Sequence, residues 1–128
     1  MTRIDVVDAS AMVAVAFAET DAESVVRRLA DSHLLAPTFM RYEVANAMCT
    51  KARREPENRA SLVALFVDFL GAAIESCDVD LVAASNLGLD HGLTVYDASY
   101  IWLARQRNAG LVTLDRQMAR VASRIGIR

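Results

Sequence analysis

The sequence predicts a single α/β domain over residues 1–128, built on a parallel β-sheet. Short apolar segments alternate with helical segments along the whole chain, which is the pattern of strands joined by right-handed helical crossovers. The length of 128 residues suits one domain, and a hydrophobic share of 54% favours a folded core over disorder. No linker, repeat or low-complexity stretch divides the chain.

The predicted strands are short apolar runs, each ending near a turn-forming or acidic residue. They cover residues 4–7, 34–36, 74–79 and 111–114. Asp8 follows the first, Pro37 stops the second and Asp115 follows the last. Residues 93–96 are expected to form a short extended link.

The predicted helices fill the intervals between these strands. We expect them over residues 11–18 with Ser10 as cap, 21–31, 38–54 with Thr38 as cap, 58–71 with Asn58 as cap, 80–90 with Asp80 as cap, 97–110 opened by Asp97, and 115–126 opened by Asp115. Val25, Val26 and Leu29 are spaced as one apolar face.

Residues 11–18 also resemble the apolar part of a signal peptide. However, Asp5 and Asp8 precede this run, and it is far shorter than the ~20 residues of a membrane span. We expect a helix of the folded domain rather than a secretion signal. Cys49 and Cys77 are expected to be buried reduced thiols, which fits the cytoplasm.

Four acidic residues lie where such a fold places its ligands. Asp8 and Asp115 follow strands, Asp97 follows the extended link, and Glu43 lies early in the helix after the second strand. Open α/β sheets bind ligands at the carboxyl ends of their strands. The sequence therefore predicts that these four side chains converge.

Each acid also has a structural interpretation. Asp8, Asp97 and Asp115 suit the N-cap position of a helix. Glu43 has apolar neighbours, so it is expected to be partly buried, where a lone charge is costly. Crowded carboxylates repel one another, and a hard divalent cation would relieve that repulsion and could activate water on a phosphodiester.

The segments around these acids resemble the PIN-domain family and, within it, the VapC-type toxins of type II toxin–antitoxin systems. The matching pieces are Val-Val-Asp-Ala-Ser at 6–10, Glu-Val-Ala-Asn-Ala at 43–47, Tyr-Asp-Ala-Ser-Tyr-Ile at 96–101 with Leu103 and Ala104, and Leu-Val-Thr-Leu-Asp at 111–115. The resemblance spans nearly the whole chain and implies a parallel sheet of four or five strands flanked by helices.

The resemblance also implies a function. It implies an endoribonuclease that uses Mg²⁺ or Mn²⁺ to activate water, leaves a 5′-phosphate and a 3′-hydroxyl, forms a homodimer and is inhibited by a small antitoxin. The implied catalytic residues are Asp8, Glu43, Asp97 and Asp115, with Asp8, Asp97 and Asp115 as metal ligands and Ser10, Asn46 and Thr113 in support. Some relatives carry an acid where this chain has Gln117, so we expect one tightly held ion.

An RNA substrate is compatible with the charge of the chain but is not predicted by it. The net charge is −2, yet 14 basic residues face 12 acidic ones once the four site acids are set aside. We expect the substrate to contact Arg41, Lys51, Arg53 and Arg54, on the helix that carries Glu43. These side chains also suit an ordinary solvated face.

Three other classes of protein share parts of the pattern. A phosphorelay receiver needs a Lys near the last strand, but Lys51, the sole lysine, lies elsewhere. A hydrolase of the haloacid-dehalogenase type needs an acid two residues after Asp8, where Ser10 stands. A catalytically inactive PIN-like domain serving as a protein-interaction module remains the alternative. His33 and His91 are poor catalytic candidates.

Overall fold

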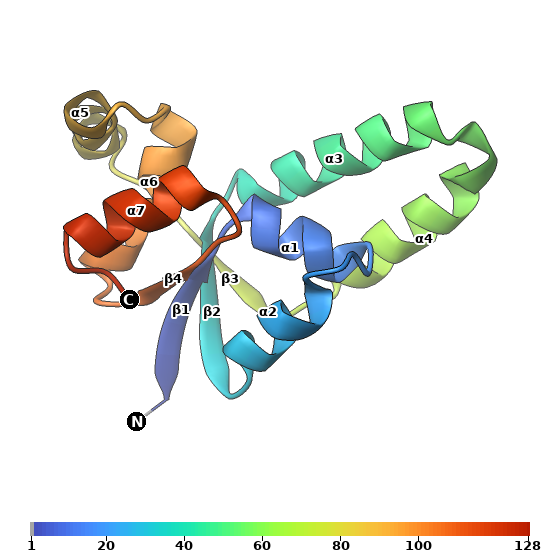
Figure 1. Cartoon of the computed structure of the whole chain (residues 1–128), viewed down its shortest axis with the longest axis horizontal. Helices are drawn as coiled ribbons and strands as arrows, with labels where there is room; N and C mark the ends of the chain where they lie inside the picture. The colour runs from blue at the N-terminus through green and yellow to red at the C-terminus, as the bar shows by residue number, and fades with distance from the viewer. Residues whose placement is uncertain (1) are drawn as a thin grey trace.

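The computed structural model describes residues 2–128 and contains one four-stranded sheet (Figure 1). The strands are β1 (Arg3–Val7), β2 (Ser32–Pro37), β3 (Ile74–Cys77) and β4 (Gly110–Val112). They lie in the order β3-β2-β1-β4, and every neighbouring pair is parallel. The predicted α/β class is confirmed, with four strands.

Helices form every connection between the strands. The connecting helices are α1 (Ala9–Ala16), α2 (Ala22–Leu29), α3 (Met40–Arg54), the 3₁₀ turn η1 (Pro56–Asn58), α4 (Arg59–Leu70), α5 (Leu81–His91) and α6 (Val95–Gln106), and α7 (Arg116–Arg124) follows the last strand. Right-handed crossovers place α1 to α4 on one face of the sheet and α5 and α6 on the other. In Figure 1, α3 and α4 extend from the body of the domain as a long hairpin.

The core lies on both faces of the sheet. Val6, Val7 and Leu35 are fully buried in the central strands, and Tyr100 and Ile101 of α6 are almost fully buried against them. This continuous burial is typical of a parallel sheet covered by helices. This packing fixes the position of the carboxyl ends of β1 and β4, where the candidate site described below lies.

A buried ion-pair network closes the opposite, amino end of the sheet. Asp5 on β1 is completely buried and is bound by Arg3 at 2.9 Å, Arg28 at 3.3 Å and the Ser32 hydroxyl at 2.7 Å. A Cβ atom at Gly110 would lie 2.4 Å from Asp5 Oδ1. β4 can therefore begin beside this carboxylate only with glycine.

Several predicted helix boundaries are wrong. Asp8, not Ser10, caps α1, because its carboxylate accepts the Ala11 N–H at 3.0 Å. Phe39 rather than Thr38 stands at the N-cap of α3, with no side-chain cap hydrogen bond. Asn58 likewise provides no such bond, since η1 leads directly into α4.

The segment before Asp97 differs most from the prediction. Residues 93–96 are not an extended link: the Thr94 side chain accepts the Asp97 N–H at 3.2 Å, and α6 begins at Val95. α6 also ends at Gln106 rather than 110. β3 ends at Cys77, two residues before the predicted 79. Asp97 is therefore in the first turn of a helix that another residue caps.

The apolar run at residues 11–18 is part of the folded domain. Ala11, Met12, Ala14 and Ala16 of α1 are buried. Over residues 2–128, no helix combines the length and the apolar character that crossing a membrane requires. Two smaller predictions were wrong: Val26 is 53% exposed rather than packed with Val25, and Cys49 and Cys77 are free but only half-buried.

Candidate active site

Asp8 is the most deeply enclosed of the four predicted carboxylates. It follows β1, is 3% exposed, and is held at both oxygens. Oδ1 accepts hydrogen bonds from the Ser10 hydroxyl at 2.7 Å and the Ala11 N–H at 3.0 Å, and Oδ2 accepts the Thr113 hydroxyl at 2.5 Å. These bonds fix the orientation of the carboxylate before any ligand arrives.

Two hydroxyls join the end of β1 to the end of β4. Thr113 Oγ1 donates to Asp8 and accepts the Asp115 N–H at 3.0 Å. Ser10 Oγ donates to Asp8 and accepts the Leu114 N–H at 2.9 Å. Each hydroxyl therefore both donates and accepts, so the two site segments are tied in one register.

Asp115 stands at the start of α7. Its Oδ1 accepts the Met118 N–H at 3.0 Å, so the predicted N-cap role and the predicted site position are both present. One oxygen of this carboxylate caps the helix. The other is left for a ligand.

Glu43 lies in the first turn of α3 and is half-buried, as expected from its apolar neighbours. Its Oε1 accepts the Tyr100 hydroxyl at 2.5 Å. Sequence reasoning missed Tyr100 and proposed Asn46 as the supporting partner. The available signal was spacing, because Tyr100 lies three residues after Asp97 on one face of α6. Asn46 instead lines the cleft beside Glu43.

Asp97 has a carboxylate free of structural duties. Thr94 provides the cap of α6, and no hydrogen bond or ion pair to the Asp97 side chain is present within residues 2–128. The side chain is half-buried. The N-cap interpretation of Asp97 is therefore wrong; the remaining structural contribution of this acid is its favourable position in the first turn of α6, near the positive end of the helix dipole.

The four carboxylates are close enough to act on one another electrostatically. Burial raises the pKa of Asp8, and the charge of Asp115 adds to this, although bonds from Thr113, Ala11 and Ser10 oppose it. Burial also raises the pKa of Glu43, with further contributions from the charges of Asp97 and Asp8. The charge of Asp8 thus acts on Glu43, and that of Asp115 acts on Asp8.

The pKa of Asp97 is also affected by neighbouring carboxylates. Burial raises its pKa first, and the charges of Asp115 and Asp8 raise it further. In the part of the chain that the structure describes, none of the four acids forms an ion pair with Lys, Arg or His. The negative charge is uncompensated by the protein itself.

This donor set fits a hard divalent cation. Carboxylate oxygens are the ligands that Mg²⁺ prefers, and Mg²⁺ commonly takes one or two of them and keeps several waters. Among residues 2–128, no group of three or more His, Cys, Asp or Glu side chains lies in an arrangement that could hold a metal ion. The chemistry of the four carboxylates, rather than a preformed cluster, is what fits a divalent cation.

A cleft of about 620 Å³ lies beside Glu43, the one of the four carboxylates that lines it. Ser10, Glu43 and Asn46 contribute to its wall, and Phe39 and Tyr96 add aromatic surface. Phe39 packs edge-on against Tyr96, with ring centroids 5.3 Å apart. The cleft thus combines polar groups and apolar surface next to Glu43.

A family model for the PIN domain matches residues 6–124 of the chain. The chain belongs to the PIN domain family. It is 39% identical over 119 residues to a protein named Ribonuclease VapC3 from Pyrobaculum aerophilum, covering 89% of this chain and 91% of that protein.

Two solved structures share the fold of this PIN domain. The crystal structure of PAE2754 from Pyrobaculum aerophilum matches with a TM-score of 0.75 and 26% identity, covering 94% of this chain and 87% of that one. VapC20 from Mycobacterium tuberculosis, described as a toxin that cleaves the sarcin-ricin loop, matches with a TM-score of 0.66 and 14% identity over 97% and 96% of the chains.

The basic residues predicted to contact substrate have different surroundings in this PIN domain. Arg41 donates to the Ser76 hydroxyl at 2.7 Å and the Ile74 carbonyl at 2.8 Å, so it is engaged with β3. Lys51 is paired with Glu19 and lies over the Phe17 ring. Arg53 and Arg54 are exposed at the far end of α3, ~15 Å along the helix from Glu43.

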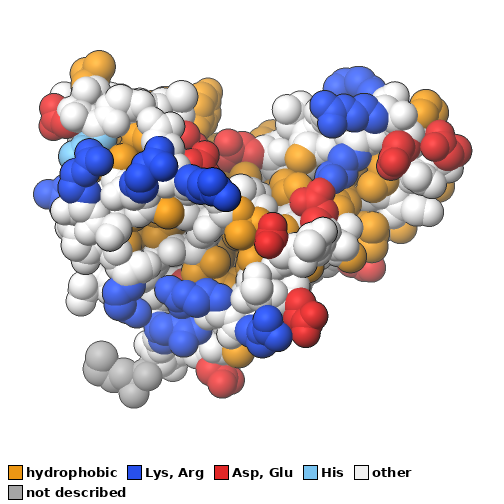
Figure 2. All heavy atoms as spheres, in the orientation of Figure 1, with side chains coloured by type: hydrophobic (Ala, Val, Ile, Leu, Met, Phe, Trp, Pro, Cys, Tyr) orange, Lys and Arg blue, Asp and Glu red, His pale blue; other side chains and the backbone are white. Residues whose placement is uncertain are grey.

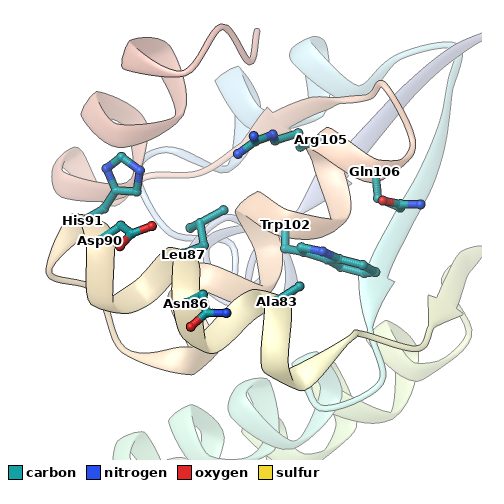
Figure 3. Close-up of a pocket in the computed structure, with 8 residues that line it drawn as sticks. All are labelled: Ala83, Asn86, Leu87, Asp90, His91, Trp102, Arg105 and Gln106. Atoms are coloured by element: carbon teal, nitrogen blue, oxygen red, sulfur yellow. The ribbon is translucent and has the colours of Figure 1, made fainter.

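A second hollow, of about 420 Å³, lies between α5 and α6 of the PIN domain (Figure 3). Its wall includes Asp90, His91, Trp102 and Arg105, and none of the four site carboxylates lines it. The other histidine, His33, contacts Glu75 at 3.0 Å, at the surface of the sheet edge. Neither histidine lies with the acids.

Proposed function

We propose that this PIN domain, over residues 1–128, is a metal-dependent endoribonuclease that acts as the toxin of a toxin–antitoxin pair. The observation that carries the proposal is the meeting of Asp8, Glu43, Asp97 and Asp115 without a protein cation. The name of the relative from Pyrobaculum aerophilum supports a ribonuclease.

A divalent cation, Mg²⁺ or Mn²⁺, is the cofactor in this proposal. Asp8, Asp97 and Asp115 would hold it, and Gln117, whose side chain reaches the Gly92 carbonyl at 3.3 Å, provides no further acid. A bound cation of this kind lowers the pKa of coordinated water and offsets charge that develops on a phosphodiester.

The side chains around the proposed cation have separate roles in the reaction. The free carboxylate of Asp97 orients water for in-line attack on phosphorus and accepts its proton. The bond from phosphorus to the 3′-oxygen breaks, and that oxygen takes up a proton from solvent, which leaves a 5′-phosphate and a 3′-hydroxyl. Ser10 and Thr113 hold Asp8 in a fixed orientation, and Tyr100 does the same for Glu43. Asn46, on the wall of the cleft, supports the substrate beside Glu43. Preorganised groups of this kind lower the barrier without rearrangement during the reaction.

The proposed partners follow from this activity. They are an RNA substrate, a small cognate antitoxin and a second copy of the chain, all in the cytoplasm. Arg53 and Arg54 remain exposed candidates for contact with RNA. Arg41 and Lys51 could make that contact only by leaving their present partners.

The proposal is tested with an Asp97→Asn variant. We expect the wild-type chain to cut RNA with Mg²⁺ or Mn²⁺, and the variant to be slower by about 100-fold or more, since a positioned acid–base group contributes about that much. Asp97 is a cleaner choice than Asp8, because Asp8 also caps α1. Product ends are read by RNA sequencing.

A binding measurement separates an active enzyme from an inactive interaction module. Mn²⁺ should raise the thermal stability of the wild-type chain, by about 2.7 kcal/mol at 100 times its dissociation constant, and raise that of Asp97→Asn less. Cleavage that persists in chelator, or is undiminished in the variant, contradicts the mechanism. A folded wild-type chain that neither binds Mn²⁺ nor cuts RNA supports the module instead.

A further inference from the structure

Helix α7 carries a row of basic side chains, which we name the α7 stripe: Arg116, Arg120 and Arg124. They are four residues apart, so they share one face of the helix with ~6 Å of rise between successive positions. All three are exposed, while Met118, Val121 and Ala122 on the other face are buried. Figure 2 shows basic side chains in a row over α7.

Local stability does not explain the α7 stripe. Arg116 occupies the first helical position, where the positive end of the helix dipole disfavours a cation, and only Arg124 lies at the favourable end. Like charges four residues apart also repel. Within residues 2–128 none of the three arginines forms an ion pair, and α7 itself contains no acid. The row therefore costs helix stability without compensation from the chain.

The stripe begins at the candidate active site. α7 starts directly after Asp115, whose carboxylate caps it and whose charge acts on Asp8 and Asp97. In Figure 2 the row borders a hollow between α7 and α3 in which acidic and apolar side chains are visible. A strand with its scissile phosphate at the carboxylates can thus continue along α7.

We propose that the α7 stripe binds successive phosphates of single-stranded RNA on one side of the cleavage point. This rests on the proposed ribonuclease function and adds the surface that holds the substrate. A guanidinium group presents a planar fork of donors that matches the oxygens of a phosphate. The evenly spaced, unpaired arginines of α7 provide three such forks, whereas Arg41 and Lys51 on α3 are already engaged.

The test compares two triple variants that remove the same charge. One is Arg116→Gln/Arg120→Gln/Arg124→Gln; the matched control is Arg27→Gln/Arg59→Gln/Arg105→Gln, three exposed arginines on α2, α4 and α6 that are not assigned to the substrate. Both are made in the Asp97→Asn background with Mg²⁺ present, so that binding is separated from cleavage. Binding of a fluorescent single-stranded RNA of mixed sequence is followed by anisotropy between about 50 and 200 mM salt. Circular dichroism checks the fold of each variant.

The expected result is specific to α7. The α7 triple should weaken binding and flatten the slope of log K against log salt by about 2, since each phosphate contact on a single strand contributes about 0.7. The control triple should change the slope less. Three results of this experiment would overturn the proposal: an unchanged slope in the α7 triple, equal flattening in both triples, or no RNA binding by the parent. The proposal also fails if the α7 triple weakens binding of an acidic protein but not of RNA.

The two proposals fail separately. A parent chain that binds RNA through α7 but, with Asp97 restored, never cuts it would remove the ribonuclease function and leave the stripe. A wild-type chain that cuts RNA while the α7 triple keeps its full salt slope would do the opposite.

Discussion

Single atoms in the site serve two neighbours at once, and Thr113 shows this most clearly. Its hydroxyl donates to Asp8 Oδ2 and accepts the Asp115 N–H. A carbon side chain of the same shape would leave both groups without a partner. The hydroxyl also lowers the pKa of Asp8, against the effect of burial.

We expect Thr113→Val to reduce kcat/KM by about tenfold, which corresponds to about 1.4 kcal/mol. It should also move the acidic limb of the pH–rate profile to higher pH, because Asp8 loses a bond that favours its charged form. Thr113→Ser keeps the hydroxyl and is the control. A Val variant with the wild-type profile would mean that Thr113 only fills space.

The residue scale also shows what the sequence could predict. Asp8 and Asp115 could be placed after strands of a parallel sheet, which is where such folds bind ligands. Asp97 was predicted to follow an extended link, but it lies in the first turn of α6 instead. The partner of Glu43 could not be predicted, because Tyr100 lies 57 residues away and only the tertiary structure brings it to Glu43. The same applies to Arg41, whose engagement with β3 depends on tertiary contacts.

Close contacts with the backbone determine how α5 connects to α6. Gly88 on α5 is buried, and a Cβ atom there would lie 2.8 Å from the Leu93 carbonyl oxygen and 3.4 Å from Ala98 Cβ. The Thr94 cap and the start of α6 pack against this glycine. Asp97 is therefore placed by a contact that requires the absence of a side chain.

We expect Gly88→Ala to destabilise the fold by about 1–3 kcal/mol through overpacking. Gly71→Ala is the matched control: its Cβ would meet only the Asp68 carbonyl, at 3.4 Å, with an ordinary φ of −82°, and should change stability by under about 1 kcal/mol. Denaturant melts measure both. Equal stability of the two variants would contradict the close packing.

Element boundaries were the least predictable feature. The sequence contains several residues able to cap α3 and α6, and local chemistry alone did not decide among them. Thr94 caps α6 in place of Asp97, and Thr38 does not cap α3. Hydrophobic periodicity placed the helices correctly because each must bury one face, whereas the exact first residue depends on neighbouring elements.

Across the whole molecule, the two ends of the sheet carry carboxylates with opposite effects on stability. At the amino end, burial raises the pKa of Asp5, but bonds from Ser32 and Arg3 and the charges of Arg28 and Arg3 outweigh it, so the pKa is lowered. At the carboxyl end, the pKa values of Asp8, Glu43 and Asp97 are raised. The charge of Asp5 at the amino end therefore stabilises the metal-free fold at neutral pH, whereas the charges of the carboxylates at the other end destabilise it.

A pair of variants measures this contrast in metal-free protein. For Asp97, a raised pKa means that its charge costs stability above the folded pKa and costs nothing below its ordinary value of 3.8. Asp97→Asn should therefore be more stable than wild type at pH 7, and the gain should disappear as the pH falls towards 3.8.

Asp5→Asn is the matched variant with the opposite sign. Its lowered pKa gives stability that is present above 3.8 and lost as the pH falls through the folded value. We expect this variant to be less stable than wild type at pH 7 and to approach it in acid. Thermal melts across pH test both, and gains or losses of the same sign would contradict the contrast.

Asp8 and Asp97 differ in how readily each could be lost during evolution. The Asp8 carboxylate caps α1, joins the end of β1 to the segment after β4 and belongs to the proposed catalytic set, so its loss would weaken the fold as well as the proposed activity. Asp97 carries no such burden. A lineage that abandons catalysis and keeps the domain for recognition should therefore lose Asp97 early and retain Asp8, leaving an aspartate that marks ancestry rather than activity.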